Sequence, residues 1–252
     1  MAKTIIILGT GASLRFCDFK ADEIWGVNGT YTTPNAMPEQ HRDKFWMTKL
    51  FMTDTLFSHE QGSLNFDIIG LNAFAEKTKC EIISLNKIKL GKHILKTKPY
   101  PYNKIVRYFR SDYFTDTICY MIAYCLYTHS YLAQSPHGVI RPELKEPLKI
   151  KFFGIDMSTT REYSQSKGGV EYWLGVGYGM GIEFENVQGS TILMHPLGVP
   201  YGKWDLMKKN VKKNAPSVDP AGVMAGKNLT EKEQEKFWKE HDGKQTNRDT
   251  NT

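Results

Sequence analysis

The stretch TIIILGTGASL, residues 4–14, decides the fold class of this chain of 252 residues. Its continuous apolar and β-branched run, residues 4–8, predicts a short strand that is covered on both faces, as in a parallel sheet. Gly9 and Gly11 follow and predict a tight turn, with a helix beginning near Ser13. Small residues let backbone N–H groups approach an anion, so this turn is a candidate phosphate site. Because Leu14 interrupts the Gly-x-Gly-x-x-Gly pattern, a tight turn without any ligand remains an alternative.

Further elements alternate along the chain. Strands are predicted at residues 24–28, 45–52, 81–85, 148–153 and 182–185, and helices at residues 58–76, 116–132 and 168–181. Thr115 or Asp116 would cap the apolar helix 116–132. The alternation predicts an α/β fold, a single Rossmann-like domain with a mostly parallel sheet, over residues 1–202.

A polar C-terminal tail is predicted from residue 203 to residue 252. It contains eleven Lys or Arg and eight Asp or Glu residues, and so contributes +3 to the formal charge of +6. Thr230 and Glu233 form a capping box, which predicts a short helix near residues 230–240. The last ten residues contain almost nothing to bury, and we expect them to be disordered.

Composition narrows the function classes. The mild surplus of +6 suits a nucleotide or another anionic ligand but does not by itself predict a nucleic-acid binder. The four cysteines have no CxxC spacing, which predicts buried free thiols in a reducing compartment, and no metal site is predicted from them. The longest uncharged stretch, residues 117–140, contains too few apolar residues to span a membrane. We therefore expect a cytoplasmic protein without a membrane partner.

Polar side chains follow several predicted strands. Asn28 comes at the end of the second strand, where ligands of open α/β sheets bind, and its amide can hydrogen-bond a base or a ribose. Asp156 comes at the end of the strand 148–153, and Glu162 and Glu171 follow. Such acids can serve as a base, orient hydroxyls or bind a divalent metal. The alternatives are a turn for Asn28, a helix cap for Asp156 and solvated faces for both glutamates.

Residues 86–112 form a basic and aromatic segment. Its prolines, Pro99 and Pro101, predict irregular structure. The basic residues are Lys87, Lys89, Lys92, Lys96, Lys98, Lys104, Arg107 and Arg110, with four aromatic residues among them. This pattern is compatible with a polyanionic acceptor contacted through charge and stacking, or with a solvated face or lid.

The order of these motifs resembles a bacterial sialyltransferase family that uses CMP-sialic acid on a Rossmann-like fold. The resemblance rests on residues 7–14, on the sequence WGVNGTY at residues 25–31, on residues 117–123 and on residues 153–156, and it spans roughly residues 4–193. The chain is similar also to 6-hydroxymethylpterin diphosphokinase-like proteins. In pattern it looks most like uncharacterised phage proteins of that group.

The resemblance implies a set of roles. Gly9, Thr10, Gly11 and Ser13 would face the nucleotide phosphates, and Asn28 and Thr117 would contact the nucleotide. The family's histidine base has no counterpart, because residues 157–185 contain no His. Asp156, Glu162 or Glu171 would then take its place.

Three functions follow as hypotheses. The first is a nucleotide-sugar-dependent glycosyltransferase-like enzyme with an unidentified acceptor, for which DNA is compatible but not required. The second is an Mg²⁺-dependent pyrophosphoryl or nucleotidyl transferase, with Asp156 and either Glu162 or Asp54 as metal ligands. The third is a non-catalytic nucleotide-binding protein with a sequestering or regulatory role. All three are compatible with assembly into a homo-oligomer.

Overall fold

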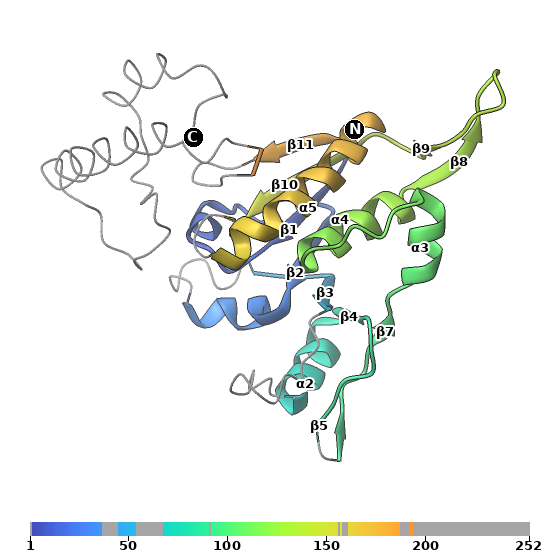
Figure 1. Ribbon diagram of the computed structural model, residues 1–252. Coiled ribbons are helices and arrows are strands. Elements are labelled where there is room, and N and C mark those ends of the chain that lie inside the picture. Colours follow the sequence, from blue (N-terminus) through green and yellow to red (C-terminus); the bar gives the residue numbers. More distant parts are fainter. Residues whose placement is uncertain are drawn as a thin grey trace, which may run out of the picture. The chain divides into compact units, whose positions relative to one another are not determined.

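A seven-stranded parallel sheet forms the centre of the structure (Figure 1). The computed structural model describes residues 2–36, 45–53, 68–90, 92–155, 157, 161–186 and 192–193. Across the sheet the strands are β11 (Glu183–Asn186), β10 (Leu148–Phe153), β1 (Lys3–Leu8), β2 (Glu23–Val27), β3 (Lys49–Met52), β4 (Glu81–Ser84) and β7 (Lys98–Pro99). Every neighbouring pair is parallel. The predicted α/β class with a mostly parallel sheet is confirmed.

The central strand β1 is buried on both faces, as its apolar run predicts. Ile5 and Ile7 pack with Trp25 on one face, whereas Ile6 and Leu8 pack on the other. All four of these β1 side chains are fully buried. A strand that points apolar side chains to both faces needs helices or loops on both, which is the arrangement of a two-sided α/β sheet.

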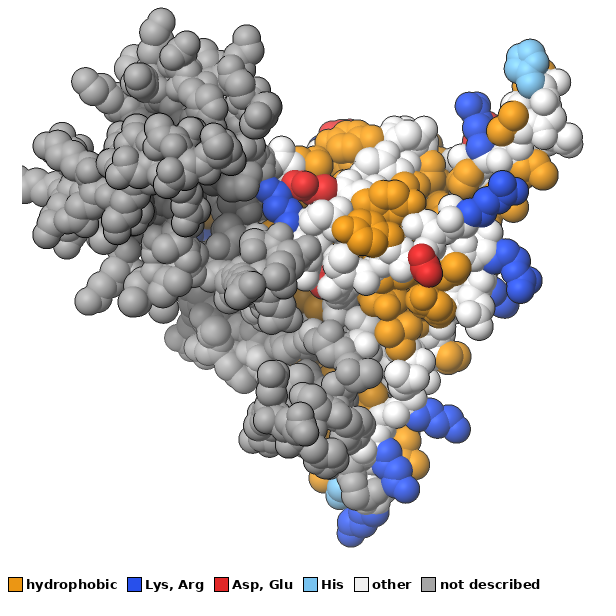
Figure 2. Space-filling view, in the orientation of Figure 1, with side chains coloured by type: hydrophobic (Ala, Val, Ile, Leu, Met, Phe, Trp, Pro, Cys, Tyr) orange, Lys and Arg blue, Asp and Glu red, His pale blue; other side chains and the backbone are white. Residues whose placement is uncertain are grey.

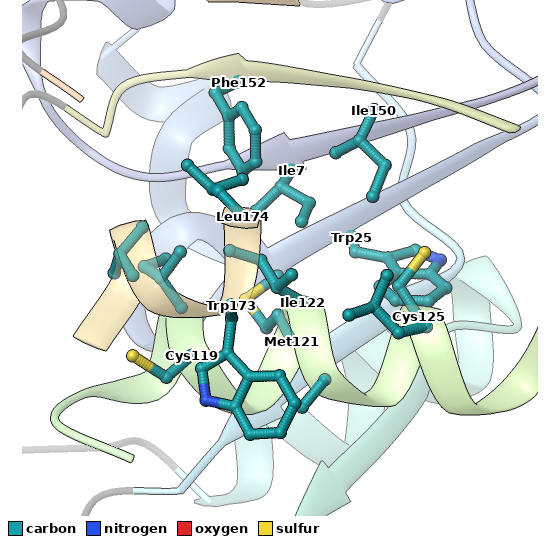
Figure 3. Close-up of a cluster of buried hydrophobic side chains, with 14 of the residues drawn as sticks. Ile7, Trp25, Cys119, Met121, Ile122, Cys125, Ile150, Phe152, Trp173 and Leu174 are labelled. Carbon is teal, nitrogen blue, oxygen red and sulfur yellow. The ribbon is translucent and has the colours of Figure 1, made fainter. Parts of the chain in front are cut away.

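Helices cover the two faces of the sheet unequally. On the face of Ile5 and Ile7 lie α3 (Tyr102–Phe109), α4 (Thr117–Thr128) and α5 (Arg161–Gly179). Figure 3 shows Met121 and Ile122 of α4, with Trp173 and Leu174 of α5, in this core. On the other face, α2 (Ile68–Thr78) packs against β3 and β4.

The central helix α4 begins where its cap predicts. Asp116 has an extended backbone, and its carboxylate accepts a hydrogen bond of 3.0 Å from the Cys119 N–H. This bond satisfies one of the amides that have no partner within the first turn of a helix. Asp116, rather than Thr115, is thus the N-cap. Eight of the twelve residues of α4 are buried, which explains its lack of charge.

The predicted end of this helix, at residue 132, was wrong. α4 ends at Thr128, and β8 (Ser130–Gln134) pairs with β9 (Ile140–Leu144) in an antiparallel hairpin. The Ser130 hydroxyl donates to the Leu126 carbonyl at 2.5 Å, which satisfies part of the open helix end. The sequence prediction missed both strands, because apolar residues such as Leu132 fit a buried helix equally well.

The expectation of irregular structure over residues 86–112 was also wrong. The segment forms a small hairpin of β5 (Lys89–Leu90) and β6 (His93–Ile94), the edge strand β7 and the helix α3. α3 forms after Pro101 because Ile105 is fully buried against the core. Pro99 is compatible with a strand because β7 is at the edge of the sheet.

Other boundaries differ by a few residues. The third strand begins at Lys49 rather than at residue 45, and α5 begins at Arg161 rather than at residue 168. Gly169 of α5 lies close to the segment before α4: a Cβ there would lie 2.1 Å from the Thr115 Oγ1, so glycine permits this contact. The expected helix after the glycine turn is instead the five-residue 3-10 helix η1 (Ala12–Phe16).

Residues 1–193 form one compact unit. The predicted tail, residues 203–252, lies outside the described residues, as does its expected helix near residues 230–240. Among the helices that the structure does describe, none combines the length and the apolar character needed to cross a membrane.

The sheet reverses its strand order at β1. From β1 the chain adds β2, β3, β4 and β7 on one side and then returns to add β10 and β11 on the other. In open α/β sheets, ligands bind outside the carboxyl ends of the strands at such a reversal. The carboxyl ends of β1 and β10 are therefore where a site is expected.

Candidate functional site

The glycine turn after β1 is bonded to the end of β10. The Gly9 N–H donates to the Phe153 carbonyl, and the Gly11 N–H donates to the Gly154 carbonyl, each at 2.8 Å. The buried Ser13 hydroxyl accepts a hydrogen bond of 2.8 Å from the Gly154 N–H. Three of the four residues that the sequence assigns to the phosphates thus make contacts within the protein. Thr10, the fourth, is exposed at the tip of the turn.

Gly9 and Gly154 lie against each other. A Cβ added to Gly9 would lie 2.2 Å from the Gly154 carbonyl oxygen, and a Cβ added to Gly154 would lie 2.4 Å from the Gly9 carbonyl oxygen. Gly154 also has φ of +70°, a conformation that favours glycine. Both loops at the strand-order reversal are therefore held in one backbone arrangement.

Asn28 lies at the same edge of the sheet, directly after β2. Because β2 is the neighbour of β1, the carboxyl ends of both strands are adjacent. Asn28 is half-buried, has φ of 44° and begins the 3-10 helix η2 (Asn28–Ala36). Asparagine tolerates this left-handed conformation better than most residues. The structure thus places Asn28 beside the glycine turn and also gives it the turn conformation of the alternative reading.

Thr117 begins α4 at this edge and is paired with a residue that the sequence analysis did not assign to the site. Its hydroxyl lies 2.7 Å from the hydroxyl of Thr53, which follows β3, and both side chains are buried. The position of Thr53 at the end of a predicted strand was the signal that could have identified it.

Of the acids predicted for the site, the structure describes the side chain of Glu171. Asp156 lies outside the described residues, as does Asp54, and nothing is described of the Glu162 side chain. Glu171 lies in α5, roughly 15 Å along the helix from Arg161 at 1.5 Å per residue. Its carboxylate accepts a hydrogen bond of 2.8 Å from the Leu193 N–H and lies 3.4 Å from the Lys167 Nζ. Glu171 therefore joins α5 to the segment around Leu193.

The described residues contain no group of three or more His, Cys, Asp or Glu side chains that could hold a metal ion. All four cysteines are free thiols, as predicted, and Cys80, Cys119 and Cys125 are buried. Burial, followed by the charge of Asp116, raises the pKa of Cys119 to about 12. A thiol with that pKa is protonated at neutral pH and is a poor nucleophile.

A separate groove of about 350 Å³ lies near the start of β4, at the opposite edge of the sheet. It is lined by side chains of α2, β4 and the segment before β7. Two ion pairs lie along it, Lys96–Glu76 and Lys98–Glu81. The groove is therefore distinct from the carboxyl edge at which Gly9, Asn28 and Thr117 lie.

Comparison of the chain with known protein families, with curated proteins and with solved structures finds no match.

Proposed function

We propose that this chain binds a nucleotide at the carboxyl ends of β1, β2 and β10 and transfers a group from a nucleotide-sugar donor, as a glycosyltransferase-like enzyme. One observation carries the proposal: the strand order reverses between β1 and β10, and the glycine-rich loops lie at that reversal. Small-molecule sites of open α/β sheets occupy this position.

The bonds of the glycine turn refine which groups would hold the ligand. Because the amides of Gly9 and Gly11 donate to the carbonyls of Phe153 and Gly154, we assign the phosphates to the exposed tip at Thr10. Asn28 would hydrogen-bond the base or the ribose, since its amide both donates and accepts. The turn would thus act as a rigid floor for the ligand, with Ser13 fixing it to Gly154.

Group transfer to a hydroxyl also requires a base. We assign this role to an acid that follows β10, with Asp156 first, because Asp156 comes three residues after the end of the strand, whereas Glu171 has contacts of its own. A positioned base typically contributes about 10²–10⁴-fold to the rate.

Ligand binding is tested by thermal unfolding of the full chain with a panel of nucleoside mono- and diphosphates and nucleotide sugars. A ligand at a hundredfold excess over its Kd raises the free energy of unfolding by about 2.7 kcal/mol. Thr10→Asp would place a carboxylate beside the phosphates and should remove the shift. Gln134→Glu, on the exposed β8 strand, adds the same charge away from the site and should retain it. No shift with any member of the panel, or equal shifts in both variants, overturns the assignment.

Turnover is tested separately with the nucleotide sugar that gives the largest shift. Asp156→Asn should abolish cleavage of the donor, which mass spectrometry measures. The same variant should retain the thermal shift that the donor causes. Turnover like that of the unmodified chain would overturn Asp156 as the base. Loss of activity on addition of EDTA would instead favour the Mg²⁺-dependent pyrophosphoryl or nucleotidyl transferase.

A second candidate function is non-catalytic nucleotide binding, and the contacts of Glu171 favour it. One of the three candidate acids already supports the structure through Lys167 and Leu193. Tight nucleotide binding by calorimetry, with no product from any donor, would identify a sequestering or regulatory protein.

A further inference from the structure

The segment of residues 85–111, which follows β4, carries more positive charge than the whole chain. Residues 85–111 contain eight Lys or Arg residues and no Asp or Glu, a formal charge of +8, whereas the complete chain has +6. The rest of the sequence is therefore slightly acidic. The positive charge of this protein is concentrated in this segment, which contains β5, β6, β7 and α3.

Most of this charge is exposed and has no acidic partner. All eight side chains are exposed, and two of them, Lys96 and Lys98, form ion pairs with Glu76 and Glu81. The remaining six make no ion pair with any residue that the structure describes: Lys87, Lys89, Lys92, Lys104, Arg107 and Arg110. Figure 2 shows Lys and Arg side chains spaced along this margin of the molecule.

The other outer strand of the sheet, β11, has charges that are paired. At β11, Lys149 pairs with Glu183 at 2.7 Å and with Glu185 at 2.8 Å. Charged residues on edge strands prevent aggregation. The charges at β11 are thus paired with opposite charges, whereas six of those in residues 85–111 have no ion pair with a described residue.

Exposed aromatic rings lie beside the basic helix α3. Tyr102, Tyr113 and Tyr172 are 36%, 48% and 40% exposed. They belong to one continuous group of rings, because Tyr102 contacts Phe114 and Tyr113 contacts Tyr172, at centroid distances of 5.7 and 5.6 Å. Phe114 and Tyr172 are joined through Trp173. Figure 2 shows hydrophobic side chains gathered over α4 and α5 next to the basic margin.

We propose that these six unpaired cations, together with the exposed rings Tyr102, Tyr113 and Tyr172, form a binding surface for single-stranded nucleic acid. Lys104 and Arg107 lie about one turn apart on α3, and Arg110 directly follows the helix, so one nucleic-acid backbone can follow them. The rings offer stacking surfaces for bases, which duplexes do not expose. An anionic membrane fits less well, because α3 buries its apolar side at Ile105 and presents a polar face.

The proposal is tested with the full chain and a fluorescein-labelled oligothymidylate of about 20 nucleotides, followed by fluorescence anisotropy. Six phosphate contacts predict that affinity falls about 300-fold between 50 and 200 mM salt. Lys104→Gln/Arg107→Gln should weaken binding about tenfold or more and lower the salt dependence. Lys20→Gln/Lys77→Gln removes two exposed charges elsewhere on the chain and should retain binding.

The aromatic half of the proposal has its own test. Tyr102→Leu/Tyr113→Leu should weaken binding about 5-fold to 100-fold with an unchanged salt dependence, since stacking is uncharged. Circular dichroism and thermal unfolding check that each variant folds. The proposal is overturned if the oligonucleotide does not bind at 50 mM salt, or if the basic-surface variant and its control bind it equally. It is also overturned if a duplex binds as tightly as the single strand and the tyrosine substitutions do not change the affinity. Binding to phosphatidylserine vesicles without binding to the oligonucleotide would overturn it in favour of a membrane.

Discussion

Gly9 and Gly154 face each other so closely that neither position has room for a Cβ: added to Gly154, it would lie 2.4 Å from the Gly9 carbonyl oxygen. This contact joins the ends of β1 and β10 at the point where the strand order reverses. The carboxyl edge of the sheet, and with it the proposed nucleotide site, depends on this backbone approach.

Gly154→Ala should therefore destabilise the protein strongly. The variant combines a left-handed conformation, which costs a residue with a Cβ about 1–2 kcal/mol, with an overlap that costs about 1–3 kcal/mol more. We expect a loss of about 3 kcal/mol in urea unfolding. Gly138→Ala is the matched control, because Gly138 has φ of +79° but no atom within 4 Å of a new Cβ. If both variants lose the same free energy of unfolding, the close approach of the two loops does not contribute to stability and the prediction is contradicted.

Ser13→Ala should destabilise the same junction without any overlap. The Gly154 N–H would lose its buried acceptor, and a buried donor without a partner costs about 1–3 kcal/mol. Ser135→Ala, in the exposed β8–β9 turn, also removes an acceptor of a backbone N–H, but water can replace it there. Urea unfolding should show a clear loss only for Ser13→Ala, and similar losses would contradict the role of the Ser13 bond.

Thr53 and Thr117 should be coupled across the candidate site. Their hydroxyls lie 2.7 Å apart and are buried, so either valine substitution alone removes one partner of the bond. Replacing both should cost less than the sum of the single losses, with a coupling energy of about 0.5–1.5 kcal/mol. A double-mutant cycle in urea measures it. Strict additivity would show that the pair does not fix α4 to the end of β3.

Glu23 should make stability depend on acid pH. Burial opposes its ionisation, but hydrogen bonds from Lys3, Lys49 and Trp25 outweigh burial and lower the pKa of Glu23 from 4.5 to about 2. The stabilisation is fully present above pH 4.5 and is lost as pH falls through about 2. Because solvent partly screens this half-buried carboxylate, we expect about 2 kcal/mol of loss.

The Glu23 prediction is checked by urea unfolding between these two pH values. Glu23→Gln should be less stable than the unmodified chain at pH 7 and should lose less free energy on acidification. Glu76→Gln serves as the control, since the Glu76 carboxylate is exposed and its ion pair with Lys96 lies at the surface. A loss in Glu23→Gln equal to that of the unmodified chain would contradict the prediction.

Local signals in the sequence were enough for the central elements. The run at residues 4–8 predicted β1, because a β-branched segment between turn residues fits a strand that is buried on both faces. The candidate caps Thr115 and Asp116 predicted the start of α4, because an N-cap acts only on the next few residues. The α/β class followed from the order of such local elements.

Contacts between distant residues decided the rest. The Ser13–Gly154 hydrogen bond joins residues that are 141 positions apart. No local pattern indicates that the amides of Gly9 and Gly11 donate to the carbonyls of Phe153 and Gly154. The sequence predicted irregular structure after β4. The structure has α3 there, which is stabilised by the burial of Ile105, and it has Pro99 in β7, where an outer strand tolerates a residue without an N–H. The sequence by itself determined the central elements, the fold class and the chain's charge. Only the tertiary structure decided which backbone groups remain for a ligand and which charges lack a partner, because hydrogen bonds and ion pairs depend on neighbours that folding brings together.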